Sequence, residues 1–249
     1  MIYLKSDQEI EIMRKAGQIV AEALLLIEEA IRPGITTKEL DRIAEEYIIR
    51  CGARPSFKGY HGFPATICAS VNEEVVHGIP GERVLKEGDI ISVDCGAFYQ
   101  GFHGDAARTF PVGKVAPEAQ RLIDVTRESF FEGLKYAKVG NRLGDISAAI
   151  QEYVEKNNFS VVRDYVGHGI GREMHEQPAV PNYGKSGRGI KLQRGLVLAI
   201  EPMVNMGTFA VKELDDGWTV VTYDGKLSAH YENTVAILDN GPEILTIKK

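Results

Sequence analysis

The sequence has few cysteines and no long apolar stretch. Cys51, Cys68 and Cys95 are its three cysteines, and none stands in CxxC spacing, which argues against a zinc ribbon or a disulfide framework. Because disulfides persist mainly in oxidising compartments, this usage predicts a reduced, cytoplasmic setting. No segment approaches the roughly 18 consecutive apolar residues of a membrane span, and residues 1–17 lack the apolar core of a signal peptide. We therefore predict no association with membranes.

A surplus of positive charge is also missing. The formal net charge is −6, which gives no indication of the basic surface that follows nucleic-acid phosphates. The 249 residues, of which 44% are hydrophobic and 26% charged, are typical of a globular chain with a substantial core. A direct role in nucleic-acid binding is therefore not predicted.

Helices and strands alternate in blocks along the chain. Ser6 and Glu9 form a capping-box pattern before apolar residues at helical spacing, and Pro33-Gly34 should stop that helix. The same patterns recur further along the chain. Helices are expected over about 7–31, 36–50, 117–135 and 145–157, with strands over 66–112 and again towards the end.

The two halves of the chain resemble each other. GITTKELDRIAEEYI from Gly34 matches GNRLGDISAAIQEYV from Gly140, 106 positions later, and KEGDIISVD matches QRGLVLAIE at an offset of 107. HGDAART around Asp105 and HYENTVA around Glu232 both read His-x-acid. Three matches in the same order favour duplication over chance. We therefore predict one pseudo-symmetric α+β domain over residues 1–249, with halves at about 1–113 and 114–249.

Acidic residues occupy corresponding places in this repeat, and they are Asp94, Asp105, Glu201 and Glu232. Asp94 and Glu201 end apolar strands, and a hairpin centred on residues 99–100 would set Asp94 roughly opposite Asp105, about 5 Å away. Each acid taken alone reads more readily as a turn cap or a surface residue. Four together predict a metal site, because clustered carboxylates repel one another unless a cation lies between them.

A histidine joins this set. His168 stands between two glycines in YVGHGIGREMHEQP, so neighbouring backbone can approach while the imidazole stays free. A lone histidine is more often an ordinary core or loop residue. Four acids and one imidazole, however, are too many ligands for one tetrahedral zinc and suit two adjacent cations about 3.5–4 Å apart. Oxygen ligands with one nitrogen favour Mn, Fe(II), Co or Zn without choosing among them.

These five residues in this order resemble the metal ligands of the methionine aminopeptidases, which are pita-bread metallopeptidases. The strings HGIPGERVLKEGDIISVDCG, GFHGDAARTF, GHGIGREMHEQP, AIEPMV and YENTV resemble that family as well, over nearly the whole chain. Only 33 positions separate His168 from Glu201, which leaves no room for the large insert of the type II branch. The resemblance implies helices outside a curved antiparallel sheet, and the type I branch in its short bacterial form without an N-terminal zinc finger.

The resemblance also implies a reaction, the removal of the N-terminal methionine from nascent proteins whose second residue is small. Hydroxide held by two divalent metals would attack the scissile carbonyl, with Glu201 as ligand and general base. The metals would also anchor the free α-amine. His77 would contact the substrate backbone and His175 would stabilise the oxyanion, although without the resemblance both read as readily as loop residues. No role is assigned to His61, His103 and His230.

A methionine side chain needs an apolar and adaptable pocket. The positions that match the family's pocket are Tyr60, Phe63, Cys68, Met174 and Trp218. Phe63 reads as readily as plain core, and nothing in the sequence makes Cys68 a nucleophile. Met174 and Phe57 stand where bacterial relatives commonly carry phenylalanine and cysteine, which should change the shape of the pocket and leave the reaction unchanged.

Two other interpretations compete with this one. An Xaa-Pro aminopeptidase would share the fold and the ligands, but those enzymes usually carry an extra N-terminal domain, whereas the first helix here begins near residue 7. A binding module that has lost catalysis is opposed by the complete ligand set. The resemblance further implies a monomer that acts on nascent N-termini, a substrate compatible with contact to the ribosome, and a monovalent cation near Asn72 and Ser228.

Overall fold

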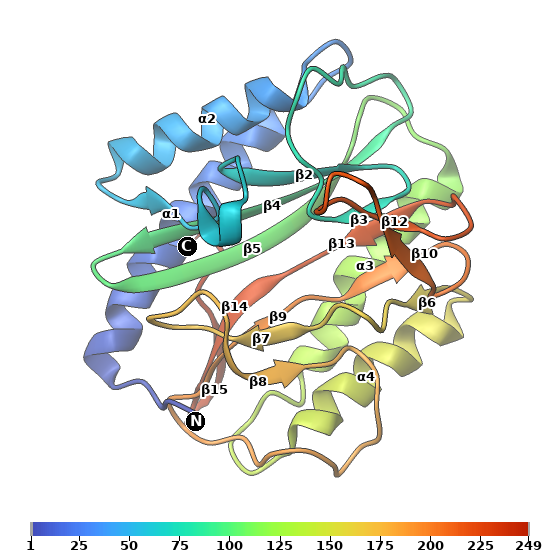
Figure 1. Cartoon of the computed structure of the whole chain (residues 1–249). Helices are drawn as coiled ribbons and strands as arrows, with labels where there is room; N and C mark the ends of the chain where they lie inside the picture. The colour runs from blue at the N-terminus through green and yellow to red at the C-terminus, as the bar shows by residue number, and fades with distance from the viewer. Residues whose placement is uncertain (1, 249) are drawn as a thin grey trace.

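The long helices begin where the sequence places their caps. The computed structural model describes residues 2–248, and its helices are α1 (Asp7–Ala30), α2 (Thr37–Arg50), α3 (Pro117–Leu134) and α4 (Leu143–Lys156) (Figure 1). Ser6 caps α1 and Thr36 caps α2, each through a reciprocal bond with the glutamate three residues later. Pro117 is the first residue of α3. Proline is tolerated there because an N–H at this position would have no acceptor within the helix. These helices confirm the predicted ones to within two residues at each end.

The strands form antiparallel sheets. One sheet contains β1 (Arg54–Pro55), β2 (Ile67–Val71), β4 (Ile90–Tyr99) and β5 (Phe102–Pro111), all of the others pairing with β4. A second runs in the order β15 (Gly241–Ile244), β14 (Asn233–Leu238), β9 (Val197–Ile200), β7 (Gly167–Gly169) and β8 (Glu176–Val180). A third sheet has the order β13 (Ser228–His230), β10 (Met203–Asn205), β6 (Ser160–Val161). A fourth has the order β11 (Val211–Glu213), β12 (Val220–Thr222), β3 (Glu74–Val76).

The helices cover the outer side of the sheets (Figure 1). Helices α1 and α2 bury one apolar cluster against β2, β4 and β5, and α3 and α4 bury another against β9, β10, β13 and β14. Helix α1 lies so close to its neighbours that a Cβ on Gly17 would stand 2.3 Å from the carbonyl oxygen of Leu245, and one on Gly104 of β5 would stand 2.9 Å from the nitrogen of Gly17. Glycine at both positions permits this approach.

Strand β5 is the seam along which the first part of the chain meets the last. Ala107 and Glu232 exchange main-chain hydrogen bonds of 3.3 and 2.9 Å. Thr234 Oγ1 accepts a hydrogen bond of 3.0 Å from the nitrogen of Asp105 and donates one of 2.9 Å to its carbonyl oxygen. β5 therefore runs antiparallel beside the start of β14, and acids from distant parts of the sequence meet there.

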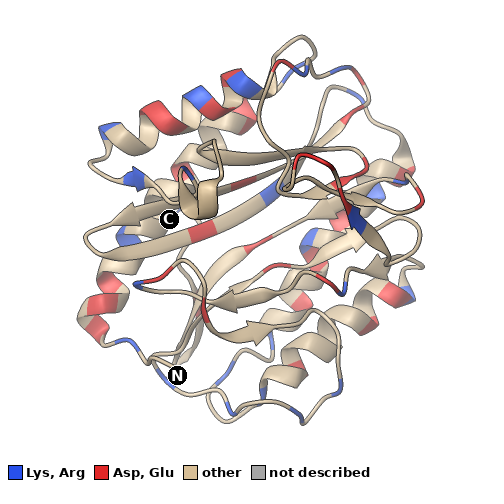
Figure 2. Ribbon diagram, in the orientation of Figure 1, with Lys and Arg blue, Asp and Glu red and all other residues tan. Residues whose placement is uncertain are grey.

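The predicted class of fold, α+β with helices outside an antiparallel sheet, is confirmed. Within residues 2–248, no helix combines the length and the apolar character that crossing a membrane requires. Much of the charge lies on helices and loops, but β4 and β5 carry acidic positions in the middle of their sheet (Figure 2). Those positions are Asp94 and Asp105.

Candidate metal centre

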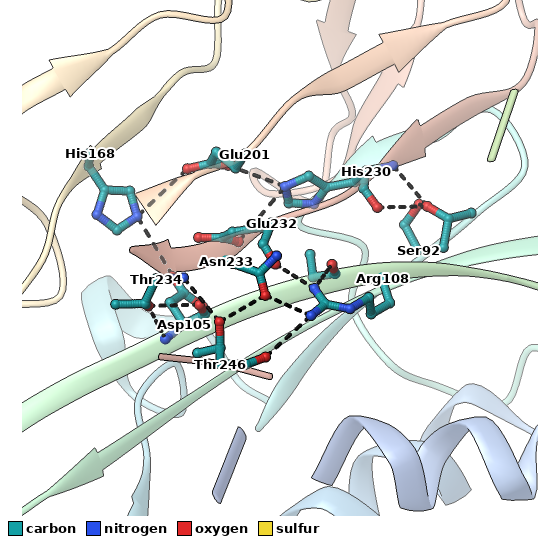
Figure 3. Close-up of polar contacts among 12 residues, drawn as sticks. Ser92, Asp105, Arg108, His168, Glu201, His230, Glu232, Asn233, Thr234 and Thr246 are labelled. Atoms are coloured by element: carbon teal, nitrogen blue, oxygen red, sulfur yellow. Dashed lines mark hydrogen bonds and ion pairs between the residues drawn. The ribbon is translucent and has the colours of Figure 1, made fainter. Parts of the chain in front are cut away.

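One small cavity, of about 120 Å³, brings together all five predicted metal ligands and two further predicted histidines. The side chains come from β3, β4, β5, β7 and β10 and from segments next to β3, β7, β9 and β14, so segments distant in sequence converge on one point. Figure 3 shows this for Asp105, His168, Glu201 and Glu232. The lining residues are Val76, His77, Asp94, Asp105, Tyr165, Val166, His168, His175, Glu201, Met203 and Glu232.

Asp94 and Asp105 come from the hairpin formed by β4 and β5. Its turn residues Gln100 and Gly101 have φ angles of 46° and 90°, the left-handed conformation that two-residue hairpin turns with primed geometry require. The turn is therefore one residue later than predicted, and Asp94 in the middle of β4 pairs with Ala107. Asp94 and Asp105, which we expected roughly opposite each other, are offset by two residues along the strands. They are diagonal neighbours, because Asp105 lies two residues from Ala107, the partner of Asp94. Side chains two residues apart on a strand point to the same face, so both aspartates lie on one face of the sheet.

Glu201 directly follows β9 and Glu232 directly precedes β14. Polar groups fix the main chain at both acids: Asn182 Nδ2 donates to the carbonyl of Glu201 at 3.0 Å, and Arg108 donates to the carbonyl of Glu232 at 2.5 Å. Arg108 is partly buried, and desolvation of its guanidinium lowers its pKa. Because the main chain is held in this way, both carboxylates are free to face the cavity.

His168 is held on β7 by close backbone packing. A Cβ at Gly167 or Gly169 would lie 2.4 Å from a carbonyl oxygen of a neighbouring strand, so only glycine lets β7 sit so tightly. His168 Nδ1 is 2.9 Å from the carbonyl oxygen of Gly169. That oxygen can only accept, which assigns the proton to Nδ1 and leaves a lone pair on Nε2. Nε2 lies 3.7 Å from both Asp105 Oδ2 and Glu201 Oε1.

Burial shapes the electrostatics of the acids. Desolvation, reinforced by the charges of the neighbouring carboxylates, raises the pKa of Asp94, Asp105 and Glu232 well above the ordinary range. Asp105 and Glu232 are 3% and 1% exposed, and Asp94 is partly exposed. One carboxylate oxygen of each is nevertheless buried without a hydrogen-bond partner. Such atoms are costly to bury, and a bound divalent cation would offset that cost.

The donor atoms lie close enough together to hold ions. Asp105, His168 and Glu232 have donor atoms within 4.8 Å of one another, and so do Glu201, His230 and Glu232. Glu232 belongs to both groups, so its carboxylate would be within reach of either of two ions. Carboxylate oxygens combined with imidazole nitrogen suit Mn, Fe(II), Co and Zn. The residues present therefore fit divalent metals of this kind.

His77 and His175 line the same cavity. Tyr60 Oη lies 2.8 Å from His175 Nδ1, and the rings of His175 and His168 are 4.2 Å apart. Partial burial and the neighbouring His168 imidazole lower the pKa of His175 to about 4, and burial lowers that of His77. Both rings are therefore neutral near pH 7, and each can donate one hydrogen bond.

The predicted pocket residues gather in one apolar cluster. Its ring contacts include Phe63 with Trp218, whose centroids are 5.1 Å apart, and Trp218 lies 6.5 Å from the ring of His77. The cluster therefore reaches the cavity through His77. It contains Phe63, Cys68 and Met174 as buried members and Tyr60 and Trp218 at its edge.

Cys68 connects this cluster to the acids, because it pairs with Asp94 between β2 and β4. Burial and the neighbouring carboxylates raise the pKa of its thiol well above the usual value, which makes it a poor nucleophile. Phe57 belongs to the same apolar cluster. The two positions that depart from the family pattern, Phe57 and Met174, therefore both lie where they can alter its shape.

His230 is the residue that sequence reasoning missed. Its Nε2 lies 3.3 Å from Glu201 Oε2 and 3.9 Å from Glu232 Oε2. The His-x-acid spacing could have found it, because residues two apart on an extended chain share a face. None of the three unassigned histidines lines this cavity, and the other two lie elsewhere. His103 bonds to Ser56 at 2.8 Å, and His61 packs edge-on against Tyr60.

The fold and the site define a metallopeptidase. Residues 11–239 match the model of metallopeptidase family M24, and the chain belongs to this family. A protein named methionine aminopeptidase from Clostridium perfringens is 67% identical over 249 residues, which cover 100% of both chains. A crystal structure of methionine aminopeptidase from Thermotoga maritima has a TM-score of 0.98 at 51% identity and covers 100% of both chains. The resemblance predicted from the sequence and the pita-bread fold are confirmed.

The predicted class of enzyme, a metal-dependent exopeptidase, is confirmed by the same findings. The similarity to Xaa-Pro peptidases, the rival assignment, is weaker. An Xaa-Pro dipeptidase from Bacillus anthracis has a TM-score of 0.79 at 25% identity, and the match covers 99% of this chain and 62% of that one. Both sequence and structure are thus more similar to the methionine aminopeptidases than to this proline-directed relative.

Proposed function

We propose that this enzyme removes the initiator methionine from nascent proteins and peptides whose second residue is small. The observation that carries the proposal is the direct contact between two features, a cavity lined by carboxylates and an apolar cluster that adjoins it through Cys68 and His77. The first suits a hydrolytic metal centre and the second suits an unbranched apolar side chain. Relatives that bear the name methionine aminopeptidase support the same substrate.

The metal ligands in this proposal are Asp94, Asp105, His168, Glu201 and Glu232, and together they would hold two divalent ions. Bound there, the ions supply Lewis acidity and lower the pKa of water. The protein contributes a preorganised set of donors, since the main chain is fixed at Glu232 by Arg108 and the tautomer of His168 is set by Gly169. The ligand set leaves the choice among Mn, Fe(II), Co and Zn open.

Glu201 is the residue best placed to move a proton. Its side chain is 13% exposed, in contrast to the 1% of Glu232, so water can reach it. It would accept the proton of the attacking water and pass it on to the leaving amine. Its Oε1 lies towards His168 and its Oε2 towards His230, so the carboxylate is held between two imidazoles (Figure 3).

His175 and His77 would act on the scissile peptide. Burial raises the pKa of Tyr60, so its hydroxyl stays protonated and can donate to His175 Nδ1. This bond would assign the proton of the neutral His175 ring to Nε2, which can then donate to the oxygen that becomes negative in the transition state. His77, which lies between the cavity and the ring of Trp218, would contact the substrate backbone.

The substrate side chain would enter the apolar cluster. Met174 contributes a flexible thioether there, which can adapt to a linear side chain. A charged or branched first residue would gain less from these walls. The free α-amine of the substrate would lie beside the carboxylates, which restricts the enzyme to chain ends.

The test is methionine release from Met-Ala-Ser by metal-stripped protein while Mn(II), Fe(II) or Co(II) is titrated in. Ala-Pro and a Met-Leu peptide serve as controls. Metal-dependent cleavage of Met-Ala-Ser alone is expected. Cleavage of Ala-Pro instead would move the enzyme to the proline-directed relatives, and no release by folded protein with any metal would refute the proposed activity.

Further expectations accompany this proposal. We infer a cytoplasmic monomer that meets its substrates as they leave the ribosome. A monovalent cation is expected near Asn72 and Ser228, which lie side by side, the nitrogen of Ser228 donating to the carbonyl oxygen of Asn72 at 2.9 Å. Gel filtration and sodium-dependent stability measurements would test the oligomeric state and the cation.

A further inference from the structure

His230 lies beside the acid cluster. Its Nε2 approaches Glu201 Oε2 to 3.3 Å, yet the residue does not line the cavity in which the five predicted ligands meet. It lines a second cavity instead, of about 450 Å³, together with Arg108, Thr109 and Tyr231. His230 thus lines one cavity, and its imidazole approaches the carboxylates that line the other.

The main chain of His230 is fixed by one side chain. Thr109 Oγ1 accepts a hydrogen bond of 2.8 Å from its nitrogen and donates one of 2.9 Å to its carbonyl oxygen. The same hydroxyl lies 2.8 Å from Ser92 Oγ, and β13 pairs His230 with Met203 of β10. With 1% exposure, the ring has little freedom to turn elsewhere. His230 is therefore built into the sheet with its imidazole directed at Glu201.

The two oxygens of Glu201 face two different imidazoles (Figure 3). Oε1 lies 3.7 Å from His168 Nε2, which presents a lone pair, and Oε2 lies 3.3 Å from His230 Nε2. His230 Nε2 is buried and makes no hydrogen bond, which is costly for an N–H group. The terminal torsion of a glutamate is soft, so a small rotation of the carboxylate brings Oε2 into line with Nε2–H.

We propose that His230 is a positioning residue, whose Nε2–H would hold Oε2 of Glu201 and so keep Oε1 directed towards His168 and the cavity that would hold the metal ions. This inference rests on the proposed metal centre. The distances of His230 from Glu201 and Glu232 would also allow a ligand role. The positioning role is favoured because His230 does not line the cavity in which the five predicted ligands meet. Groups that orient metal ligands in this way typically change metal affinity about 10- to 100-fold.

The experiment measures Mn(II) binding to metal-stripped protein by titration calorimetry, with the fold of each variant checked by circular dichroism. His230→Leu and His230→Phe remove the donor, and the phenylalanine also keeps a planar ring in its place. Both should weaken Mn(II) binding about 10- to 100-fold. His230→Gln keeps an N–H donor and should restore binding to near that of the parent chain. Ser92→Ala, a control that removes a buried hydroxyl beside Thr109, should bind like the parent chain.

Three results would overturn the positioning role. Parent-like binding by both donor-free variants would show that Glu201 needs no partner, and a glutamine variant as weak as the leucine one would exclude hydrogen-bond donation as the cause. The visible absorption of bound Co(II) adds a second readout, since a changed spectrum in His230→Gln would make the imidazole a direct ligand and refute the positioning role. A parent chain that binds no Mn(II) would refute the metal centre itself. One that binds Mn(II) without releasing methionine would refute only the proposed function.

Discussion

The molecule buries carboxylates in two different ways. Both carboxylate oxygens of Glu176 on β8 have a partner. Lys5 Nζ lies 2.5 Å from Oε2, and the main-chain nitrogen of Arg172 donates a hydrogen bond of 2.8 Å to Oε1. Asp105 and Glu232 are at least as buried, yet each has an oxygen without any partner, and the nearest imidazoles stand 3.7 and 3.9 Å away. The same fold thus satisfies one buried acid and leaves a cluster of others unsatisfied.

The presence or absence of partners at buried carboxylates separates a structural site, around Glu176, from the candidate functional site, around Asp105 and Glu232. The Lys5–Glu176 pair ties the start of the chain to β8, next to His175, and is complete within the protein. The acids of the cavity repel one another, which lowers stability unless cations bind. A protein retains such a cluster when binding or catalysis depends on it. Four experiments can break or sharpen this contrast.

The largest effect is expected at Glu201. Glu201→Gln keeps the shape of the side chain but removes its charge and its ability to accept a proton, so kcat/KM for Met-Ala-Ser should fall about 10²- to 10⁴-fold. Glu176→Gln, the matched change in the structural pair, should leave kcat/KM within about tenfold, because Glu176 does not line the cavity. Initial rates with saturating Mn(II) measure both. Equal losses in the two variants would contradict the division into functional and structural acids.

The next effect concerns stability. Lys5→Met leaves Glu176 as a buried charge without its cation, and the free energy of unfolding should fall by about 3–5 kcal/mol. The double variant Lys5→Met with Glu176→Leu removes both charges and should recover most of that loss. Urea denaturation of the metal-stripped protein gives the values. A loss below about 1 kcal/mol in the single variant would show that water reaches the pair after all.

A third experiment uses pH and metal. The pKa of Asp105 is raised in the folded state, so the stability linked to its protonation is present at low pH and is lost as the pH rises from the ordinary carboxyl range towards the folded value. Asp105→Asn should therefore stabilise the metal-free protein relative to the parent chain, and increasingly so between about pH 5 and pH 8.

Bound Mn(II) should make the parent chain more stable than Asp105→Asn, the reverse of the order expected without metal. Mn(II) at 100 times its dissociation constant stabilises the parent chain by about 2.7 kcal/mol, whereas the asparagine variant should gain much less. Thermal or urea unfolding with and without Mn(II) across this pH range measures both effects. A difference between the two chains that is independent of pH would mean that Asp105 is already ionised and paired in the folded protein.

The smallest effect is expected at Tyr60. Tyr60→Phe removes one neutral hydrogen bond to His175 Nδ1, worth about 1 kcal/mol, so kcat should fall about fivefold with little change in KM. Tyr153→Phe on α4, which removes a hydroxyl bonded to Glu128 far from the cavity, is the control and should have parent activity. If kcat falls in both variants, or in neither, the Tyr60 hydroxyl does not support the action of His175.

Much of the fold could be predicted because its signals are local. Ser6 and Thr36 start their helices through bonds to residues three positions away, so the caps are readable in a short window of sequence. The candidate metal ligands could be selected because acids at corresponding places of a repeat, with a histidine between glycines, are improbable as ordinary surface residues. Their order also carried the resemblance that the comparisons confirm.

The sequence by itself determined which side chains could hold metal, where the long helices begin and which family the chain belongs to. Only the tertiary structure decided that Asp94 pairs with Ala107, that Arg108 fixes the carbonyl of Glu232, and that His230 faces Glu201. These arrangements depend on a turn with left-handed backbone at Gln100 and on the pairing of β5 with a segment more than a hundred residues away. Register and distant pairing arise from the packing of the whole sheet, and no local propensity encodes them.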